Sequence, residues 1–275
     1  MIDSKTKIVG VIGNPVEHSL SPLMHNAAFS KLGTNYVYLA FRVSDVKGAL
    51  DGMRALGIRG FNVTIPHKVE VMKYLDEVDG LAARIGAVNT VVNDDGLLKG
   101  YNTDCSGAVG ALLERTKLKG KNVVILGAGG AARAVAFGAL ENGAHVVVVN
   151  RTEEKAAELA CDLNKYFNGK AVPGSMEQVK DCDVLVNTTS VGMYPDAGKS
   201  PVKKELLNKQ MLVMDIVYNP VETRLLREAK DAGCATISGV EMFVNQGALS
   251  FEMFTGKRAP KEVMRETVLK ILEKR

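Results

Sequence analysis

The sequence predicts an α/β protein of two domains, and three observations support this. Apolar, β-branched runs alternate with helix-forming segments along most of the chain, which is typical of βαβ units and mostly parallel sheets. The 275 residues are many for one hydrophobic core and suit two. A glycine-rich turn, Gly127 to Ala132, follows one apolar run and opens into helix formers. The alternation predicts the fold class, and the length predicts the number of domains.

The first hundred residues contain a regular series of elements. Strands are predicted over residues 7–12, 36–43, 59–64, 87–92 and 97–101, and helices over residues 21–32, 46–56 and 67–75. The last two strands are expected to form a hairpin around Asn93-Asp94-Asp95-Gly96. Pro66 precedes the third helix, as proline at a helix start permits.

The rest of the chain continues the alternation after a predicted helix over residues 104–115. Strands are expected over residues 122–126, 145–149, 184–187, 211–215 and 235–238, and helices over 131–140, 240–254 and 261–274. We place a domain boundary near residue 104. Residues 1–103 then form one domain, residues 104–239 form the second, and the C-terminal helices (240–275) return to complete the first.

Composition excludes several classes of protein. A balance of 35 basic and 31 acidic residues gives +4, too small an excess to indicate nucleic-acid binding. No apolar run reaches the ~18 residues of a membrane span, and charges in the first ten residues argue against a signal peptide. The four cysteines show neither a metal-binding spacing nor a disulfide framework. We expect a cytoplasmic protein with reduced thiols and no metal.

The glycine-rich turn has the G-x-G-x-x-G/A spacing of a dinucleotide site. Gly127 permits a tight turn, Gly129 lets the backbone approach a pyrophosphate, and Ala132 allows close helix–strand packing. The N–H groups at the start of the helix would then face the phosphates. The alternative is an ordinary glycine-rich βα turn, but the strand–turn–helix–strand context favours a nucleotide.

The end of the following strand favours NADP over NAD. An NAD site usually has an acidic residue there, whereas this chain has Asn150-Arg151-Thr152. The planar cation of Arg151 suits a 2′-phosphate, and Thr152 and Lys155 can add a hydroxyl and a second positive charge. Alternatively, Thr152 is the N-cap of the next helix.

Polar patches follow several predicted strands, where ligands bind in open α/β sheets. Ser19 and Ser21 offer two hydroxyls near a helix start, a suitable site for a carboxylate, although Ser21 could instead cap that helix. The dipole of a helix start disfavours the cation of Lys68, which alternatively is an ordinary surface lysine. Asp104 is a candidate ligand or an N-cap. The remaining patches are residues 86–90, 187–193, 215–220 and 239–246.

Taken together, these motifs resemble those of shikimate dehydrogenases. GNPVEHSLSP, FNVTIPHK, GAVNT, YNTD, GAGGAAR, NRT, DIVYNP and the late Asn245-Gln246 occur in that family's order, over residues 8 to 255. The resemblance implies a substrate domain and a Rossmann-like dinucleotide-binding domain with a cleft between them. It also implies reduction of 3-dehydroshikimate to shikimate with NADPH, in the synthesis of aromatic amino-acid precursors.

The resemblance further implies a role for each matching residue. Lys68 and Asp104 match the catalytic acid–base pair. The implied substrate ligands are Ser19, Ser21 and Tyr218 for the carboxylate, and Asn62, Thr64, Asn89, Asp104 and Gln246 for the ring hydroxyls. The implied cofactor residues are Gly127, Ala128, Gly129, Gly130 and Ala131 for the pyrophosphate, Asn150, Arg151, Thr152 and Lys155 for the ribose phosphate, and Thr188, Ile216, Gly239 and Met242 for the nicotinamide.

Lys155 departs from the family pattern, because some members carry a second arginine there. The alternatives are a quinate/shikimate dehydrogenase with relaxed substrate or NAD use, methylene-tetrahydrofolate dehydrogenase, and a non-catalytic protein that senses shikimate-like ligands. The polar patches do not suit a pterin, which is bound by aromatic stacking, and this argues against methylene-tetrahydrofolate dehydrogenase. The presence of both Lys68 and Asp104 argues against a non-catalytic sensor. We expect a small-molecule substrate, no nucleic-acid or membrane partner, and a possible homodimer.

Overall fold

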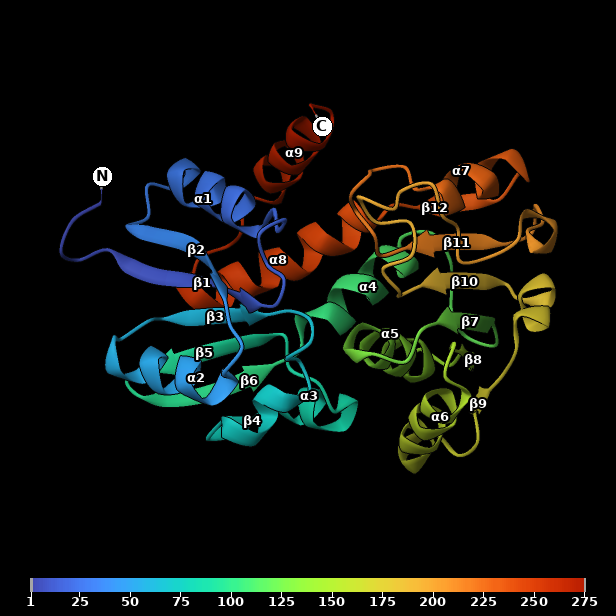
Figure 1. Ribbon diagram of the computed structural model, residues 1–275, viewed down its shortest axis with the longest axis horizontal. Coiled ribbons are helices and arrows are strands. Elements are labelled where there is room, and N and C mark those ends of the chain that lie inside the picture. The colour runs from blue at the N-terminus through green and yellow to red at the C-terminus, as the bar shows by residue number, and fades with distance from the viewer. Residues whose placement is uncertain (1, 275) are drawn as a thin grey trace. The chain divides into compact units, whose positions relative to one another are not determined.

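The computed structural model describes residues 2–274 and divides the chain into two compact units, which Figure 1 shows as two sheets with their helices. Unit 1 contains the described residues up to Thr103 and from Gln246 onward, and unit 2 is Asp104–Asn245. Unit 2 therefore ends inside helix α8 (Gly239–Thr255), whereas the sequence placed its limit at residue 239. Met1 and Arg275, the ends of the predicted ranges, lie outside the described residues.

Unit 1 contains a six-stranded mixed sheet. Its elements are β1 (Lys7–Gly13), α1 (Ser21–Lys31), β2 (Tyr36–Arg42), α2 (Val46–Ala55), β3 (Gly60–Val63), the 3-10 helix η1 (Glu70–Tyr74), β4 (Glu77–Val78), α3 (Gly80–Ile85), β5 (Thr90–Asp94), β6 (Leu97–Tyr101), most of α8 and α9 (Lys261–Leu272). The strand order is β2-β1-β3-β5-β6-β4. β1 is parallel to β2 and β3, and β5 is antiparallel to β3 and β6.

Helices pack on the two faces of this sheet. Leu50 and Met53 of α2 join a buried cluster with Ile12, Val63 and Leu98 of the strands. A second buried group joins α1 to α8, where the rings of Phe29 and Phe251 stack at 5.1 Å. The hairpin of β5 and β6 turns at Asp95 and Gly96, both with positive φ, which confirms the predicted hairpin.

Unit 2 contains a fully parallel six-stranded sheet in the order β12-β11-β10-β7-β8-β9. Its elements are α4 (Thr103–Leu113), β7 (Asn122–Leu126), α5 (Gly130–Glu141), β8 (His145–Val149), α6 (Glu153–Phe167), β9 (Ala171–Pro173), η2 (Met176–Asp181), β10 (Val184–Asn187), η3 (Lys204–Leu206), β11 (Leu212–Asp215), α7 (Arg224–Asp231), β12 (Ala235–Ile237) and the start of α8. The strand order reverses between β7 and β10. Such a switch point, at the carboxyl ends of the strands, is where open α/β sheets bind ligands.

One predicted element is wrong. Residues 67–75 do not form an α-helix: a turn at 65–69 leads into η1. The buried ring of His67 contacts the carbonyl of Val43 at 2.8 Å, and the His67 N–H donates to Thr64, three residues back. These contacts hold the segment in tight turns, so the helix-dipole argument for Lys68 does not apply. The short elements α3, β4, β9 and α7 were not predicted.

Candidate active site

Ser19 and Ser21 lie just after β1, at the start of α1. Leu20 is the N-cap of α1, and no side chain caps it. The interpretation of Ser21 as a helix cap is therefore wrong. Ser21 is only 7% exposed, and its N–H donates to Oγ of Ser19 at 3.3 Å. The structure thus brings the two serines together and leaves the helix start without a capping side chain, which suits an anion.

Asn62, on β3, belongs to a buried polar network. Its Nδ2 donates to Oγ of Ser250 (2.9 Å) and Oγ1 of Thr90 (3.0 Å). Its Oδ1 accepts from the hydroxyl of Tyr38 at 2.7 Å. Both amide hydrogens are thus used inside unit 1, and Asn62 can offer a ligand only the second lone pair of its oxygen.

Asn89 fixes the start of α4. Its Oδ1 accepts from the N–H of Thr103 at 2.7 Å, and its Nδ2 donates to Oγ1 of Thr103 at 2.9 Å. Asp104 lies in the first turn of α4, so the interpretation of Asp104 as its N-cap is wrong. The residue before Asn89, Val88, donates its N–H to the carbonyl of Lys68 at 2.8 Å. One short segment therefore holds both the half-buried Lys68 and the residue that precedes Asp104.

Thr64 and Gln246 are the other predicted ring-hydroxyl ligands of unit 1. Thr64 lies against the end of β1, because a Cβ added to Gly13 would lie 2.3 Å from its Cγ2. Gln246 is half-buried on α8, beside Gly247. A Cβ added to Gly247 would lie 2.3 Å from Cε of Met24, so α8 lies against α1 at this point. Gln246 is thereby placed beside the helix that begins at Ser21.

The glycine loop of unit 2 joins β7 to α5. Gly127 has φ +111°, a conformation that favours glycine, and an added Cβ would lie 2.7 Å from Oγ1 of Thr188. Gly129 is the N-cap of α5 and provides no capping side chain. An added Cβ at Gly129 would meet nothing within 4 Å. The first N–H groups of α5, from Gly130 and Ala131 onward, are therefore open to a phosphate, which is the arrangement that the pyrophosphate of a dinucleotide needs.

The end of β8 presents positive charge. Arg151, Thr152 and Lys155 are exposed, and the half-buried Asn150 donates through Nδ2 to the carbonyl of Thr152 at 2.8 Å. Thr152 is the N-cap residue of α6 but makes no side-chain capping bond. Its hydroxyl therefore serves no capping purpose here. Exposed cations beside a hydroxyl that caps no helix are groups suited to binding a phosphate.

The residues predicted for the nicotinamide end lie around the carboxyl ends of β7, β10 and β11. Thr188 donates through Oγ1 to the carbonyl of Leu126 at 2.6 Å, next to Gly127. A Cβ added to Gly239 would lie 2.5 Å from the carbonyl oxygens of Ile216 and Val217. Met242 follows on α8 and is 6% exposed. Unit 2 thus brings Thr188 to Gly127 and Ile216 to Gly239.

Tyr218, predicted beside the substrate carboxylate, lies beyond β11 in unit 2. It is half-buried, and its ring stacks on Phe243 of α8 at 4.3 Å. This stacking limits the directions in which its hydroxyl can point.

Several residues of these networks were missed by the sequence analysis. They are Tyr38 and Ser250 in unit 1 and Thr223 in unit 2, while Thr90 and Asp215 were noted only as parts of motifs. Burial is the signal that identifies them: polar side chains with almost no exposed area must find partners inside the protein. Burial is invisible in a single sequence.

Two buried ionisable groups have shifted pKa values. Burial raises the pKa of Asp215 to about 6, against three hydrogen bonds that favour the carboxylate. Burial lowers the pKa of His25 on α1 to about 3, and both of its ring nitrogens lack a hydrogen-bond partner. His25 stacks on Tyr38 at 4.3 Å, so its neutral ring serves as an apolar surface beneath the Asn62 network.

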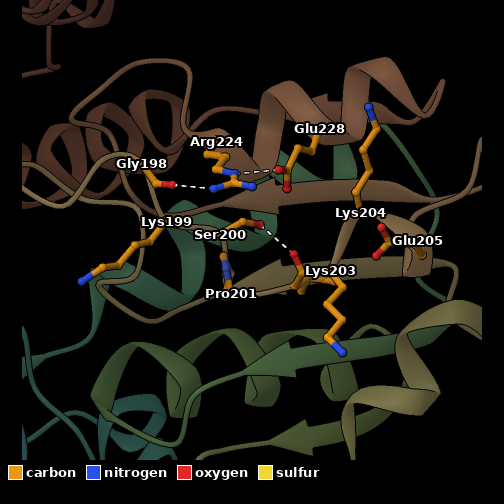
Figure 2. Close-up of a pocket in the computed structure, with 10 residues that line it drawn as sticks. Gly198, Lys199, Ser200, Pro201, Lys203, Lys204, Glu205, Arg224 and Glu228 are labelled. Carbon is orange, nitrogen blue, oxygen red and sulfur yellow. Dashed lines mark hydrogen bonds and ion pairs between the residues drawn. The ribbon is translucent and has the colours of Figure 1, made fainter.

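A separate surface hollow of unit 2, drawn in Figure 2, contains none of the predicted site residues. It is lined by residues 198–205 with Arg224 and Glu228. Figure 2 shows Arg224 donating both to Glu228 (2.6 Å) and to the carbonyl of Gly198 (2.8 Å). Lys199 and Lys204 pair with Asp196 and Asp231. Most of the charged side chains of this hollow thus have partners within the protein, and the hollow is not the candidate site.

Two kinds of feature are absent from residues 2–274. No group of three or more His, Cys, Asp or Glu side chains is arranged to hold a metal ion. No helix of this range is both long and apolar enough to cross a bilayer.

A parallel sheet with a glycine loop at its switch point, joined to an α/β unit with a dense polar network, defines a two-domain nucleotide-dependent dehydrogenase. Three family models match the chain in order: the shikimate dehydrogenase substrate binding domain over residues 11–91, shikimate/quinate 5-dehydrogenase over 111–237, and the shikimate 5′-dehydrogenase C-terminal domain over 239–269. The chain belongs to the shikimate dehydrogenase family. This confirms the family and the fold class predicted from the motifs.

Relatives and solved structures agree along the whole chain. Shikimate dehydrogenase (NADP(+)) of Methanocaldococcus jannaschii is 51% identical over 278 residues, which cover 98% of both proteins. A crystal structure of a shikimate dehydrogenase in complex with NADP+ superposes with a TM-score of 0.95 at 49% identity, covering 99% of this chain and 98% of the other. The shikimate 5-dehydrogenase of Thermus thermophilus, in complex with NADP(H) and shikimate, gives a TM-score of 0.89 at 39% identity, covering 96% and 99%. The predictions of an NADP-dependent shikimate dehydrogenase are thereby confirmed.

Proposed function

We propose that this chain catalyses the reversible reduction of 3-dehydroshikimate to shikimate with NADPH, and that the predicted residues carry it. The observation that supports these roles most strongly is the segment 88–89. Its backbone holds Lys68, and its Asn89 side chain holds Thr103, the neighbour of Asp104. Two residues predicted to share proton transfer are thus attached to one short segment of unit 1.

Unit 2 binds the cofactor in this proposal. The N–H groups of residues 127–131 hold the pyrophosphate, and Arg151, with Asn150, Thr152 and Lys155, holds the ribose phosphate. Thr188, Ile216, Gly239 and Met242 enclose the nicotinamide end. When bound, NADPH supplies the hydride that the ketone carbon receives.

The substrate is bound mainly by residues of unit 1. Ser19 and Ser21, with Tyr218, hold the carboxylate. The ring hydroxyls are held by Asn62, Thr64, Asn89, Asp104 and Gln246. Asn62 accepts a hydrogen bond through its one remaining lone pair, because its amide hydrogens are used by Thr90 and Ser250. A site whose polar groups are fixed by neighbouring residues rejects an analogue that lacks a hydroxyl, because the protein group that would bond this hydroxyl would be buried without a partner.

Lys68 moves the proton. As hydride reaches the carbon, negative charge develops on the ketone oxygen, and Nζ of Lys68 supplies a proton to it. Asp104 orients that ammonium and accepts from a ring hydroxyl. In the reverse direction, neutral Lys68 takes the proton from the shikimate hydroxyl.

A spectrophotometric assay tests the proposal. Purified protein should reduce NADP with shikimate, and should do so at least about 10-fold less efficiently with NAD, because the NAD ribose offers Arg151 no phosphate. Quinate serves as the substrate control. Faster turnover of quinate, or equal use of NAD, would overturn the assignment of substrate or of cofactor.

The setting of the enzyme is also proposed. No disulfide joins any of the four cysteines (Cys105, Cys161, Cys182, Cys234), all of which lie within the described residues, and this suits the cytoplasm. A homodimer is expected, and light scattering on a sizing column would establish the mass in solution.

A further inference from the structure

Asp215 is a buried carboxylate to which no role in binding or proton transfer is given above. It is the last residue of β11 and has no exposed surface. Its Oδ1 accepts from the N–H of Val217 (3.0 Å) and Nδ2 of Asn187 (2.9 Å), and its Oδ2 accepts from Oγ1 of Thr223 (2.7 Å). All three donors are neutral, so no cation offsets the cost of burying the carboxylate.

Asn187 extends this network to a second loop. It ends β10 and lies opposite Asp215 in the parallel register. Its Oδ1 accepts from both N and Oγ1 of Thr189, at 3.0 and 2.7 Å, and its Nδ2 also reaches the carbonyl of Val191 at 3.3 Å. Asp215 therefore fixes residues 216–217 directly, and through Asn187 it fixes residues 188–191.

These two loops are the walls of the predicted nicotinamide end. The first carries Thr188, against which Gly127 packs, and the second carries Ile216, against which Gly239 packs. Both loops follow strand ends beside the switch point of the sheet. A movement of the Asp215 carboxylate would shift both walls at once, whereas the bond from Asn150 to the carbonyl of Thr152, beside Arg151, does not involve it.

We propose that Asp215 is a positioning residue for hydride transfer, which fixes the loops 188–191 and 216–217 through one shared carboxylate. The inference rests on the proposed function, because it assigns these loops to the nicotinamide. A buried carboxylate accepts charge-assisted hydrogen bonds from several donors at once, which are shorter and stronger than neutral bonds. An amide at the same place is neutral, so its single acceptor oxygen can give Val217 and Asn187 only neutral, weaker bonds, and its NH₂ group must turn toward Thr223.

Asp215→Asn tests this, with Asp183→Asn as its matched control. Asp183 precedes β10 at the opposite edge of the same sheet, where its carboxylate accepts from the N–H of Asn122 (2.9 Å) and from Nζ of Lys121 (2.7 Å). Both variants remove one carboxylate that ties neighbouring strands. Only Asp215 contacts the loops in question. Thr223→Val is a second control, since it removes the Oδ2 partner and the cap of α7 but leaves both loops bonded.

Asp215→Asn should lower kcat about 10- to 100-fold, as a small misplacement of reacting groups does. The Kd for NADPH should change less than about threefold, because the pyrophosphate and ribose-phosphate contacts dominate binding. Backbone amides of residues 188–191 and 216–217 should exchange with deuterium faster than in the wild type. Asp183→Asn and Thr223→Val should lower the melting temperature with kcat within about twofold of the wild type.

Two outcomes would overturn the inference: a folded Asp215→Asn enzyme with wild-type kcat and wild-type exchange in both loops, or an equal loss of kcat in Asp183→Asn. Failure of the proposed function is distinguishable. Wild-type protein would then not turn over shikimate with NADP, whereas the exchange experiment would still report whether Asp215 holds the loops.

Discussion

The carboxyl edges of the two sheets are built differently. In unit 1 the polar side chains bond to each other: Asn62 to Ser250 and Thr90, and Asn89 to Thr103, all with little exposed area. In unit 2 the groups assigned to the ligand are backbone N–H groups after Gly129 and the exposed side chain of Arg151.

The difference reflects the chemistry of what each edge binds in the proposed function. A ring with several hydroxyls is recognised by neutral donors and acceptors, whose directions matter, so each must be held by neighbours. A phosphate is recognised by charge and by a helix start, which the backbone provides without side-chain neighbours. Unit 2 also has a buried side-chain network, around Asp215, beneath the loops proposed to enclose the nicotinamide.

The largest expected effect tests the chemistry of unit 1. Lys68→Ala should lower kcat about 10²- to 10⁴-fold, the usual contribution of general acid–base catalysis, with little change in the KM for shikimate. Steady-state kinetics with NADPH and 3-dehydroshikimate, and in the reverse direction with NADP and shikimate, measures both constants. Lys73→Ala, an exposed lysine of η1, is the matched control and should retain wild-type kinetics.

Asp104→Asn sharpens the same test. It should lower kcat and also raise the KM for shikimate, because Asp104 has two proposed roles. The double variant should lose less than the product of the single losses, since the two residues act as a unit. A Lys68→Ala enzyme with normal kcat and weak substrate binding would reduce Lys68 to an anchor, and Tyr218 would be the next candidate for the proton donor.

The next effect tests the exposed charge of unit 2. Arg151→Ala removes charge-assisted bonds to the ribose phosphate, a class worth about 1.5–3 kcal/mol, so the KM for NADP should rise about 10- to 100-fold. The KM for NAD should stay nearly constant. Lys170→Ala, which removes an exposed cation just before β9, is the control. Equal weakening of both cofactors would make Arg151 structural.

A smaller effect tests the start of α1. Ser19→Ala and Ser21→Ala should each raise the KM for shikimate about 5- to 150-fold, because truncating a hydroxyl that bonds a charge costs about 1–3 kcal/mol. Binding of NADPH to the free enzyme should be unaffected. Ser30→Ala, exposed on the same helix, provides the control. Unchanged substrate affinity in both site variants would contradict a carboxylate site here.

The smallest effect concerns how stability depends on pH. Acidification affects one buried group in each unit, and the two effects on the free energy of unfolding have opposite signs. His25 has its pKa lowered to about 3, so its contribution to stability is lost as the pH falls below the unfolded value of about 6.5. Between pH 7 and pH 5 this loss is about 2 kcal/mol. Asp215 has its pKa raised to about 6, so its contribution is lost as the pH rises through 6 and partly returns on acidification.

Urea unfolding at pH 7 and pH 5 separates the two groups. His25→Phe should lose less stability on acidification than the wild type, because the ring that must be charged is gone. Asp215→Asn should lose more stability on acidification than the wild type, because it lacks the carboxylate whose protonation offsets part of the loss. His18→Gln, an exposed histidine, is the control and should follow the wild type. Identical pH dependence in all four proteins would show that neither buried group controls acid stability.

Much of this protein could be predicted from local patterns. The glycine loop, the basic strand end after β8 and the hairpin at Asp95-Gly96 depend on residues close together in sequence, whose spacing determines their geometry. The prediction of an α-helix over residues 67–75 was wrong because the local sequence does not show that the His67 ring is buried against the carbonyl of Val43. The caps of α1 and α4 were also misjudged. Asn89, which caps α4, comes from a different segment of the chain, just before β5.

The sequence by itself therefore determined the α/β alternation, the dinucleotide motif, the preference for NADP and, through its motifs, the family. Only the tertiary structure decided the hydrogen-bond partners of the buried polar groups. The Asn62 amide donates to Ser250 and Thr90, the Asn89 side chain bonds to Thr103, and the Asp215 carboxylate connects two loops. The physical reason is the cost of burying polar groups. Each must find a partner where the fold places it, and those partners lie far away in the sequence.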